Sequence, residues 1–565
     1  MKKKLVILGL DGATFDLILP WIEKGWLPNI DRIISEGSWG YLKSTIPHNS
    51  AVAWTSFITG KNPGNHGIYD FYYRTAKNYD INFIDFNCIR GKAFWDVIGE
   101  AGGKVGVINV PVTYPAPEIN GYLISGLMAP EVNEKAFYPR DLYGELISKV
   151  GDFDVRVYAK DYLRFQKFDQ LFQKIMDVVD KRYTVLNYLM ETRHWDALCY
   201  VFSGTDFVQH FFWVHSDKEH PLHNRELGKK FGNCMLRVYQ KIDSLVGELV
   251  RKLPSETSIL IMSDHGAGPN SNRAIFLNNW LAQEGFLAFS DNDDRWRPSS
   301  AYMLRNLISL GRKYIPRKYK DKIKQFARIK SKSHSYFRFS GIDWSHTKAF
   351  SDDNRGTIWV NLKGRNAQGT VEPGSEYEEI RDLIIQKAKG LRDPETGEIV
   401  FEDVLKREEV YFGKYVDKAP DILLLQAKRK YTLLYRLSNA NRRSDVFRTF
   451  TFRQLTETQP AANASHRQNG ILIMKGPHIR RGHRFSGAKI IDIAPTVLYL
   501  MNLAIPEDMD GKVLGDAIDP GYWGKYPPRF CRTAVDGPEE ETESVLSEDE
   551  ADQVRRNLQG LGYLE

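Results

Sequence analysis

The sequence predicts an α/β protein with a mostly parallel central sheet, helices on both faces of that sheet, and smaller inserted segments. Three largely apolar runs carry this prediction, at residues 5–10, 105–110 and 258–262. A strand with one face in water alternates apolar and polar residues, whereas an unbroken run is typical of a strand covered on both faces. Segments with helical spacing separate these runs, which favours parallel strands linked by helices.

The other elements are predicted from apolar spacing and from Gly or Pro stops. Helices are expected at residues 27–37, 51–59, 93–101, 168–191, 236–253, 375–389 and 490–501. Further strands are expected at residues 195–202, 357–362, 421–425 and 470–474. Strands and helices therefore take turns along most of the chain, as in other α/β proteins.

One segment breaks this alternation. Residues 291–340 are basic and irregular, with ten Lys or Arg between Arg312 and Lys332. Such a charge run is often a solvated surface excursion. Because Tyr and Ile residues interleave with the cations, a second interpretation stays open, in which the segment reaches over a site and attracts an anionic partner at a membrane surface.

We therefore expect four parts. They are a first part of the core at residues 1–290, a basic insertion that forms a lid or cap at 291–340, a second part of the core with a small cap-like insertion at 341–515, and a tail at 516–565. The tail carries eight Asp or Glu between Asp536 and Glu550 and then closes with VRRNLQGLGYLE. We predict that it forms a peripheral strap.

The composition excludes several classes of protein. The chain has 565 residues, of which 42% are hydrophobic and 26% charged, so it can bury a large core. A formal net charge of +7 is too small for this length to indicate specific nucleic-acid binding. The four cysteines form no C-x-x-C pair, which argues against a thiolate zinc site and favours a reducing location.

The same survey gives an expected location. The apolar stretch before Asp11 is too short for a secretory signal. No apolar run approaches the roughly 18 residues of a transmembrane helix. We expect a cytoplasmic protein with at most peripheral membrane contact, and the sequence leaves its oligomeric state open.

The stretch from Ser44 to Phe71 holds the first side chain that could carry chemistry. Residues 51–59 are apolar and small enough for a buried helix, which places Ser50 at its N-cap. Ser at this position usually accepts hydrogen bonds from free backbone N–H groups. The positive end of a helix also favours an alkoxide and a bound phosphate, so Ser50 is a candidate nucleophile. The local sequence leaves both interpretations open.

Acidic residues and histidines follow the predicted strands. Asp11 comes directly after the first strand, and Asp264-His265 follows the strand at 258–262. Asp206 and His210 follow the strand at 195–202, and their spacing of four residues places them on one helix face. Asp11 and Asp206 could instead be helix caps, but an Asp-His pair at the end of a buried strand is hard to explain by packing alone.

These positions can meet in the folded chain. The carboxyl ends of parallel strands lie along one edge of a sheet, and His466 stands just before another predicted strand. Three Asp and three His suit two divalent cations bound by nitrogen and oxygen ligands. Two such cations about 3.5–4 Å apart can activate a nucleophile and neutralise a phosphoryl transition state. Ser50 would be that nucleophile.

With these residues in place, the sequence resembles the alkaline phosphatase superfamily, and more closely its type I phosphodiesterase/nucleotide pyrophosphatase branch. The similar pieces occur in the family order between residues 5 and 515: LGLDG around Asp11, AWTSFITGKNPGNHGI after Ser50, Asp206-x-x-x-His210, SDHG at 263–266, and His466. The tail also resembles those of prokaryotic members. The resemblance implies an alkaline-phosphatase-like fold and a metal-dependent phosphoric ester hydrolase.

The resemblance also implies residue roles. One metal would be held by Asp206, His210 and His466, and the other by Asp11, Asp264 and His265, with Ser50 bridging to it. The family usually uses zinc, with manganese or magnesium as alternatives for the two divalent ions. Many members have Thr in place of Ser50, and nucleotide pyrophosphatases place an Asn about twenty residues later, where this chain has Asp70. We assign Asn49 and Asp70 as substrate contacts.

Three functions remain open. The first is hydrolysis of a phosphodiester or nucleotide pyrophosphate bond in a small or lipid-like substrate. The second is a phosphomonoesterase or phosphomutase of the same superfamily, and the third is a non-catalytic binding protein at a membrane surface. We identify no obvious extra Lys or Arg beside the matched motifs, although distant residues could fold in. This favours diesters, because a monoester carries one more negative charge.

Overall fold

The computed structural model describes residues 3–75, 79–152, 157, 159–290, 339, 341–352, 355–427, 432–436, 445–458, 463–532 and 544–564. The basic segment 312–332 lies outside these residues, so its predicted role stays a prediction. Within the part of the chain that is described, no helix is both long enough and apolar enough to cross a lipid bilayer.

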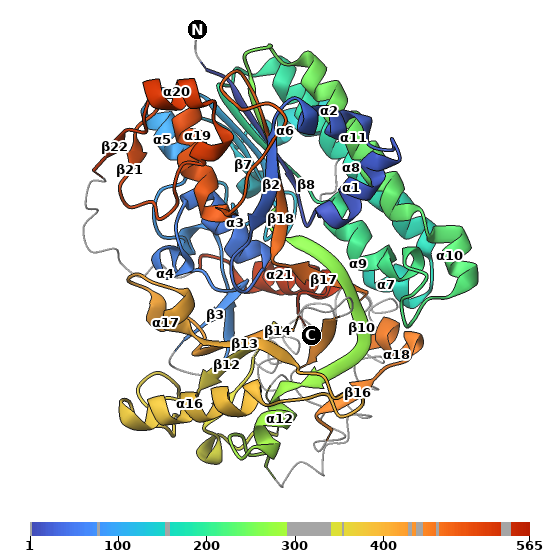
Figure 1. Ribbon diagram of the computed structural model, residues 1–565, viewed down its shortest axis with the longest axis vertical. Helices are drawn as coiled ribbons and strands as arrows, with labels where there is room; N and C mark the ends of the chain where they lie inside the picture. The colour runs from blue at the N-terminus through green and yellow to red at the C-terminus, as the bar shows by residue number, and fades with distance from the viewer. Residues whose placement is uncertain are drawn as a thin grey trace, which may run out of the picture.

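A central sheet of ten strands organises the molecule (Figure 1). In spatial order its strands are β19 (His483–Arg484), β2 (Ser38–Lys43), β18 (Asn469–Lys475), β9 (Ser258–Met262), β1 (Leu5–Leu10), β8 (Ala197–Phe202), β5 (Val105–Val110), β6 (Gly121–Ser125) and β7 (Phe137–Tyr138), and β20 (Ala488–Lys489) also pairs with β2. The strands from β9 to β6 are parallel. Every residue of β1, β5, β8 and β9 is buried, so the prediction of a mostly parallel, doubly covered sheet is confirmed.

Helices cover both faces of this sheet. Alternate residues of β1 point to opposite faces, so Val6 and Leu8 join one apolar cluster and Leu5 and Ile7 join another. The first face is covered by α1 (Phe15–Glu23), α2 (Pro28–Ser35), α8 (Phe168–Thr192), α9 (Gly204–Ser216) and α11 (Cys234–Lys252), with α6 (Leu142–Val150), α7 (Ala159–Arg164) and α10 (Arg225–Phe231) at its margin. The second face is covered by α3 (Ser50–Thr59), α5 (Phe94–Glu100) and α19 (Ile493–Leu500).

A second unit is built by the chain after β9. The long strand β10 (Gly266–Phe276) leads away from the central sheet, as the green ribbon in Figure 1 shows. It pairs with β15 (Thr432–Arg436), β16 (Phe447–Thr449) and β17 (Ala464–Arg467). A separate sheet contains β11 (Ala349–Phe350), β12 (Thr357–Val360), β14 (Ile422–Gln426) and β13 (Phe401–Lys406), and α16 (Ser375–Lys389) packs against it.

The strands predicted at 357–362 and 421–425 are therefore present, as β12 and β14, and they lie in a sheet of their own rather than in the central sheet. They pair with each other in antiparallel register and share an apolar cluster with α12 (Leu277–Gln283) and α16. The sequence does not distinguish the two outcomes, because a short apolar run shows that a strand is buried but not in which sheet.

The remaining elements are short. They are α4 (Pro63–His66), β3 (Tyr72–Arg74), β4 (Ile81–Phe83), α17 (Arg407–Val410), α18 (Phe452–Thr458), β21 (Ile505–Pro506), α20 (Pro520–Lys525) and β22 (Phe530–Cys531). Single turns of 3₁₀-helix lie at Phe86–Cys88, Glu134–Ala136, Trp344–His346, Val416–Lys418, Ile490–Asp492 and Gly515–Ala517.

The C-terminal helix α21 (Glu548–Leu561) is part of the core, so the prediction of a peripheral strap is wrong. It begins with a capping box between Ser547 and Glu550 and buries Val554 and Leu558 in the larger apolar cluster. Gly562 ends it in the left-handed conformation, with φ of 82°. The chain then turns inward, and Figure 1 shows the C-terminus in the middle of the molecule, between the central sheet and the second unit.

A cavity-forming change in α21 tests this placement. Leu558→Ala is expected to lower the free energy of unfolding by ~2–5 kcal/mol, because the side chain is 0% exposed and its removal leaves a void. The matched control is Val545→Ala, since that side chain is 62% exposed and should change stability by under ~0.5 kcal/mol. Urea unfolding of both variants gives the comparison, and equal midpoints would contradict the buried position of α21.

Candidate metal centre

Three carboxylates meet because three neighbouring strands end at one edge of the sheet. Asp11 follows β1, Asp264 follows β9, and Asp206 lies in the first turn of α9, directly after β8. The strands β9, β1 and β8 are adjacent and parallel, so their carboxyl ends coincide. All three side chains are buried. The strand order thus explains how residues more than 250 positions apart come into contact.

His466 reaches the same edge by a different route. Strand β18 runs antiparallel to β9, so its beginning lies where β9 ends. Strand β17 comes just before β18 and pairs with β10, which places His466 opposite Ala267. The sequence located His466 correctly before a strand, and the antiparallel direction of that strand is what carries it to the site.

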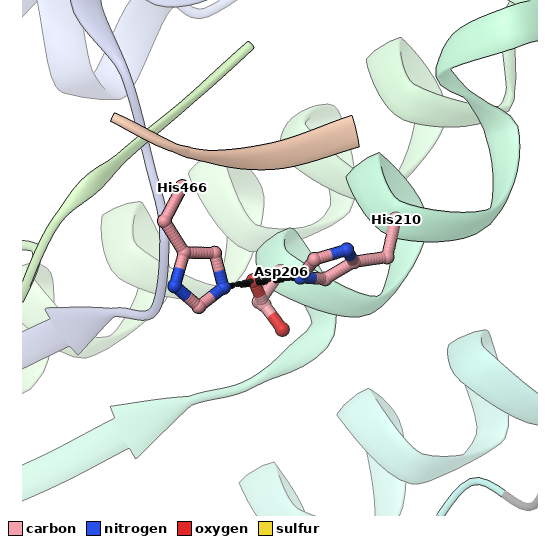
Figure 2. Close-up of side chains that lie close together, drawn as sticks. All are labelled: Asp206, His210 and His466. Atoms are coloured by element: carbon pink, nitrogen blue, oxygen red, sulfur yellow. Dashed lines mark hydrogen bonds and ion pairs between the residues drawn. The ribbon is translucent and has the colours of Figure 1, made fainter. Parts of the chain in front are cut away.

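The first group consists of Asp206, His210 and His466, which point toward one another in Figure 2. His210 Nε2 lies 3.2 Å from Asp206 Oδ1 and 3.1 Å from His466 Nε2. His466 Nε2 lies 3.7 Å from the same Asp206 oxygen. One ligand atom from each residue therefore surrounds a common point, which is the arrangement that a single cation requires.

The second group consists of Asp11, Asp264 and His265. His265 Nε2 lies 3.3 Å from Asp264 Oδ2 and 3.9 Å from Asp11 Oδ1. The two groups are neighbours, because the His265 and His466 rings stack with centroids 3.6 Å apart. The structure thus assembles the six predicted residues into the two predicted triplets.

The three histidines are held in orientations that suit metal ligation. His210 Nδ1 lies 3.1 Å from the Ala464 carbonyl, His265 Nδ1 2.9 Å from that of Gly266, and His466 Nδ1 2.9 Å from that of His48. A carbonyl oxygen only accepts, so each Nδ1 carries the proton and donates it. Each Nε2 then carries no proton, and its lone pair points toward the other residues of its metal group, as in many histidine metal sites.

The carboxylates also fit bound cations. Asp11 Oδ1, Asp206 Oδ1 and Asp264 Oδ2 are buried and have no hydrogen-bond partner among the described residues. The other oxygen of Asp264 accepts from the Gly12 N–H at 3.2 Å. A buried carboxylate oxygen without a partner is costly unless a cation compensates it. The residues present therefore fit two divalent ions.

The pKa shifts have the same origin. Burial, together with the charges of Asp264 and Asp206, raises the pKa of Asp11 well above its usual range. Burial also raises the pKa of Asp264. Burial opposes ionisation of Asp206 too, but its interactions with His210, His265 and Tyr563 together outweigh burial and lower the pKa of that carboxyl. These acids crowd one another, and two cations would relieve that repulsion.

Ser50 lies beside the second group. Its Oγ is 3.1 Å from His265 Nε2, and the residue is buried at the start of α3. The predicted N-cap position is off by one residue, because Asn49 has the extended backbone of an N-cap and its Oδ1 accepts from the Ala51 N–H at 2.8 Å. Ser50 is the first helical residue, so its hydroxyl is not used for capping.

Asn49 and Asp70 form part of a hydrogen-bonded chain. Asn49 Nδ2 donates to Asp70 Oδ1 at 2.8 Å, and Asp70 Oδ2 accepts from Arg355 Nη1 at 2.6 Å. Arg355 precedes β12 in the second unit, so this chain joins that unit to the start of α3. The structure gives Asn49 and Asp70 a role in positioning the Ser50 turn, and their contact with substrate stays a prediction.

Two cations line the adjacent cleft: Arg467, which stands beside a matched motif and was overlooked, and Arg355, one of the distant residues that the sequence interpretation left free to fold in. The cleft has a volume of about 860 Å³ and is lined by His210 and His466 as well as by Arg355 and Arg467. Arg467 directly follows His466 in the sequence, and this position could have indicated that it lies near the site. Arg355 is far from every motif in the sequence. It lies at the cleft because the second unit packs there.

Arg467 binds backbone carbonyls. Its Nη2 donates to the Pro269 carbonyl at 2.6 Å and its Nη1 to the His466 carbonyl at 3.2 Å. Burial lowers the pKa of this guanidinium to about 10. Among the residues that the structure describes, no carboxylate forms an ion pair with it. A Cβ at Gly268 would lie 2.7 Å from Arg467 Nε, so a larger residue there would displace this side chain.

Another overlooked residue is Tyr563. Its hydroxyl donates to Asp206 Oδ2 at 3.0 Å. Burial and the charges of Asp206 and Asp11 raise the pKa of this phenol, while a hydrogen bond with Ser50 opposes the rise. The sequence held a signal for it, because the apolar spacing of α21 and the following Gly562 predict a buried helix that ends in a turn.

A family model describes most of this chain. Residues 5–451 match the model of the type I phosphodiesterase/nucleotide pyrophosphatase family. The chain belongs to this family. The family consists of phosphoric ester hydrolases, so the two groups described above are a candidate two-metal site of a hydrolase of this kind. No curated protein sequence matches the chain.

Solved structures give weaker likenesses. Murine ectonucleotide pyrophosphatase/phosphodiesterase 5, as an inactive variant with AMP, is 14% identical with a TM-score of 0.46, covering 89% of this chain and 96% of its own. The human counterpart is 13% identical with a TM-score of 0.45, covering 91% and 100%. Phosphonoacetate hydrolase from Sinorhizobium meliloti, with phosphonoformate, is 15% identical with a TM-score of 0.48, covering 89% and 95%.

Metal binding is expected to strengthen as pH rises. A carboxyl pKa raised on folding stabilises the metal-free protein at low pH, and that contribution is lost as pH rises through the folded-state pKa. The raised pKa of Asp11 therefore means that a proton competes with the cation there. The increase in Tm caused by added Zn²⁺ should therefore grow as the pH is raised above the ordinary range of a carboxyl pKa.

Proton release gives the direct measurement. Calorimetric titration of the metal-free protein in buffers of different ionisation enthalpy should show protons released on binding, and fewer in Asp11→Asn. A rise in Tm that is the same at every pH, with no released protons, would contradict the competition.

Proposed function

We propose that this protein is a two-metal phosphodiesterase in which Ser50 is the nucleophile. One observation carries the proposal: the buried Ser50 hydroxyl does not cap the helix, and its oxygen lies 3.1 Å from His265 Nε2, beside the two adjacent Asp/His groups. Zinc is the proposed metal, because three histidine nitrogens and three carboxylates match its usual ligands. When bound, the two ions would favour the Ser50 alkoxide and neutralise charge on the phosphoryl group.

The chain's own residues supply the rest of the reaction. The Ser50 hydroxyl gives up its proton to solvent and its Oγ attacks phosphorus, the bond to one alcohol breaks and that alcohol takes up a proton, and Ser50 is left esterified to the phosphate that still carries the second ester group. Water then attacks the same phosphorus, which releases Ser50 and the second product. The positive end of α3, where Ser50 lies, would favour the negative charge of the phosphoryl oxygens. The Asn49–Asp70–Arg355 chain keeps this turn in place.

A second candidate function is hydrolysis of phosphomonoesters. The observation that favours it is Arg467, a partly buried guanidinium that lines the cleft next to His466 and donates hydrogen bonds only to carbonyl oxygens among the described residues. Such a group could bind the extra charge of a monoester. We place diesters first because the family match is to phosphodiesterases.

The four cysteines are free, which supports the proposed cytoplasmic location.

Replacing the nucleophile tests the mechanism. Ser50→Ala should lower kcat by at least ~10³-fold, because it removes the hydroxyl that forms the covalent intermediate, while both metals stay bound. The matched control is Thr55→Val, since Thr55 lies on the same helix and its hydroxyl donates to the Ala51 carbonyl, one turn before it. The wild-type enzyme should also gain the mass of one p-nitrophenylphosphoryl group on Ser50 when quenched in acid during turnover of bis(p-nitrophenyl) phosphate. Near-normal turnover in Ser50→Ala would exclude the assignment.

A substrate comparison separates the two candidate reactions. We expect kcat/KM for bis(p-nitrophenyl) phosphate to exceed that for p-nitrophenyl phosphate, each measured with added Zn²⁺. Arg467→Gln should raise KM for the monoester more than for the diester, because only the monoester carries the second negative charge. The reverse order of kcat/KM in the wild-type enzyme would make the monoester the preferred substrate.

A further inference from the structure

The C-terminal segment enters the metal centre. Figure 1 shows the chain ending in the middle of the molecule, and the Tyr563 ring lies 5.5 Å from the ring of His466 and 5.9 Å from that of His210, measured between centroids. Tyr563 is buried, with 6% of its surface exposed. It lies outside residues 5–451, the part of the chain that matches the family model. The family match therefore assigns this residue no role.

Tyr563 acts on one oxygen of one metal-group carboxylate. Its hydroxyl donates to Asp206 Oδ2 at 3.0 Å. The other oxygen, Oδ1, has no hydrogen-bond partner among the described residues and is the one that faces His210 and His466. A carboxylate can rotate about its last bond and exchange its two oxygens. A hydrogen bond to one of them therefore fixes which oxygen is presented to the cation.

Three separate contacts keep the phenol in this position. Leu558 and Leu561 anchor the preceding helix in the core, and Gly562 turns the chain toward the site. Arg355 Nη2 donates to the Tyr563 carbonyl at 3.1 Å, so the residue is also tied to the second unit. The Phe71 ring lies against the Tyr563 ring, with centroids 5.0 Å apart. Helix α21, the second unit and the strand-end loops thus converge on one side chain.

We propose that Tyr563 is a positioning residue for the first metal group, and that the C-terminal segment completes the site by fixing the orientation of Asp206. This inference rests on the proposed two-metal function and adds a residue to it. Its consequence is that the Asp206, His210 and His466 site loses affinity when the hydroxyl is removed, while the Asp11, Asp264 and His265 site does not.

Tyr563→Phe tests the proposal, because it removes the hydroxyl and keeps the ring. Calorimetric titration of the metal-free protein with Zn²⁺ should show one of two sites weakened about 10–100-fold and the other unchanged. The kcat for bis(p-nitrophenyl) phosphate at low Zn²⁺ should fall and recover at high Zn²⁺, because mass action refills a weakened site. A purely structural residue would change Tm but would not give this recovery.

Tyr114→Phe is the matched control. Tyr114 is also buried, and its hydroxyl donates to Glu550 Oε1 at 2.7 Å, in the first turn of the same helix. The control therefore loosens α21 at its far end without touching a metal-group residue, and its Zn²⁺ affinities should equal those of the wild type. If Tyr563→Phe binds Zn²⁺ at both sites as tightly as wild type, or if Tyr114→Phe loses the same affinity, the proposal is overturned. If the wild type itself binds no Zn²⁺, the two-metal function fails and the positioning role fails with it.

Discussion

Asp11, Asp206 and Asp264 lie at the carboxyl ends of three adjacent parallel strands, and the spacing of the strands keeps the three carboxylates close together. Each is buried, and each has an oxygen without a hydrogen-bond partner among the described residues. Neighbouring carboxylates repel one another strongly in a medium of low dielectric constant, so this cluster of three is unstable unless cations or protons balance its negative charge. Much of the surrounding structure can be understood as the means of placing cations there.

The histidines and Ser50 fit this constraint. His210, His265 and His466 each use Nδ1 on a backbone carbonyl and direct Nε2 into the acidic cluster. Helix α3 directs its positive end to the same point, with Ser50 as its first residue and Asn49 as its cap. Capping by the neighbour matters for the chemistry, because a hydroxyl already engaged with backbone N–H groups would be a poorer nucleophile.

Parts of the chain that are distant in sequence complete this centre. Strand β10 leads from the central sheet to the second unit, and Arg355 of that unit lines the cleft. Strand β17 pairs with β10 and places His466 and Arg467 at the same cleft. At the place where nucleotide pyrophosphatases are expected to have an Asn, this chain has Asp70, whose carboxylate binds Arg355 instead. The resulting ion pair links the nucleophile turn to the second unit and, through Arg355, to the Tyr563 backbone.

The sequence by itself determined the strands β1, β8 and β9, the residues that follow them, and the set of six candidate ligands. It could do so because unbroken apolar runs identify doubly covered strands, and the ends of such strands in parallel sheets lie on one edge. Only the tertiary structure decided that β12 and β14 belong to a second sheet, that Asn49 rather than Ser50 caps α3, and that Arg355 and Tyr563 reach the site. These outcomes depend on how separate units pack against one another, and long-range packing has no local periodicity from which it could be predicted.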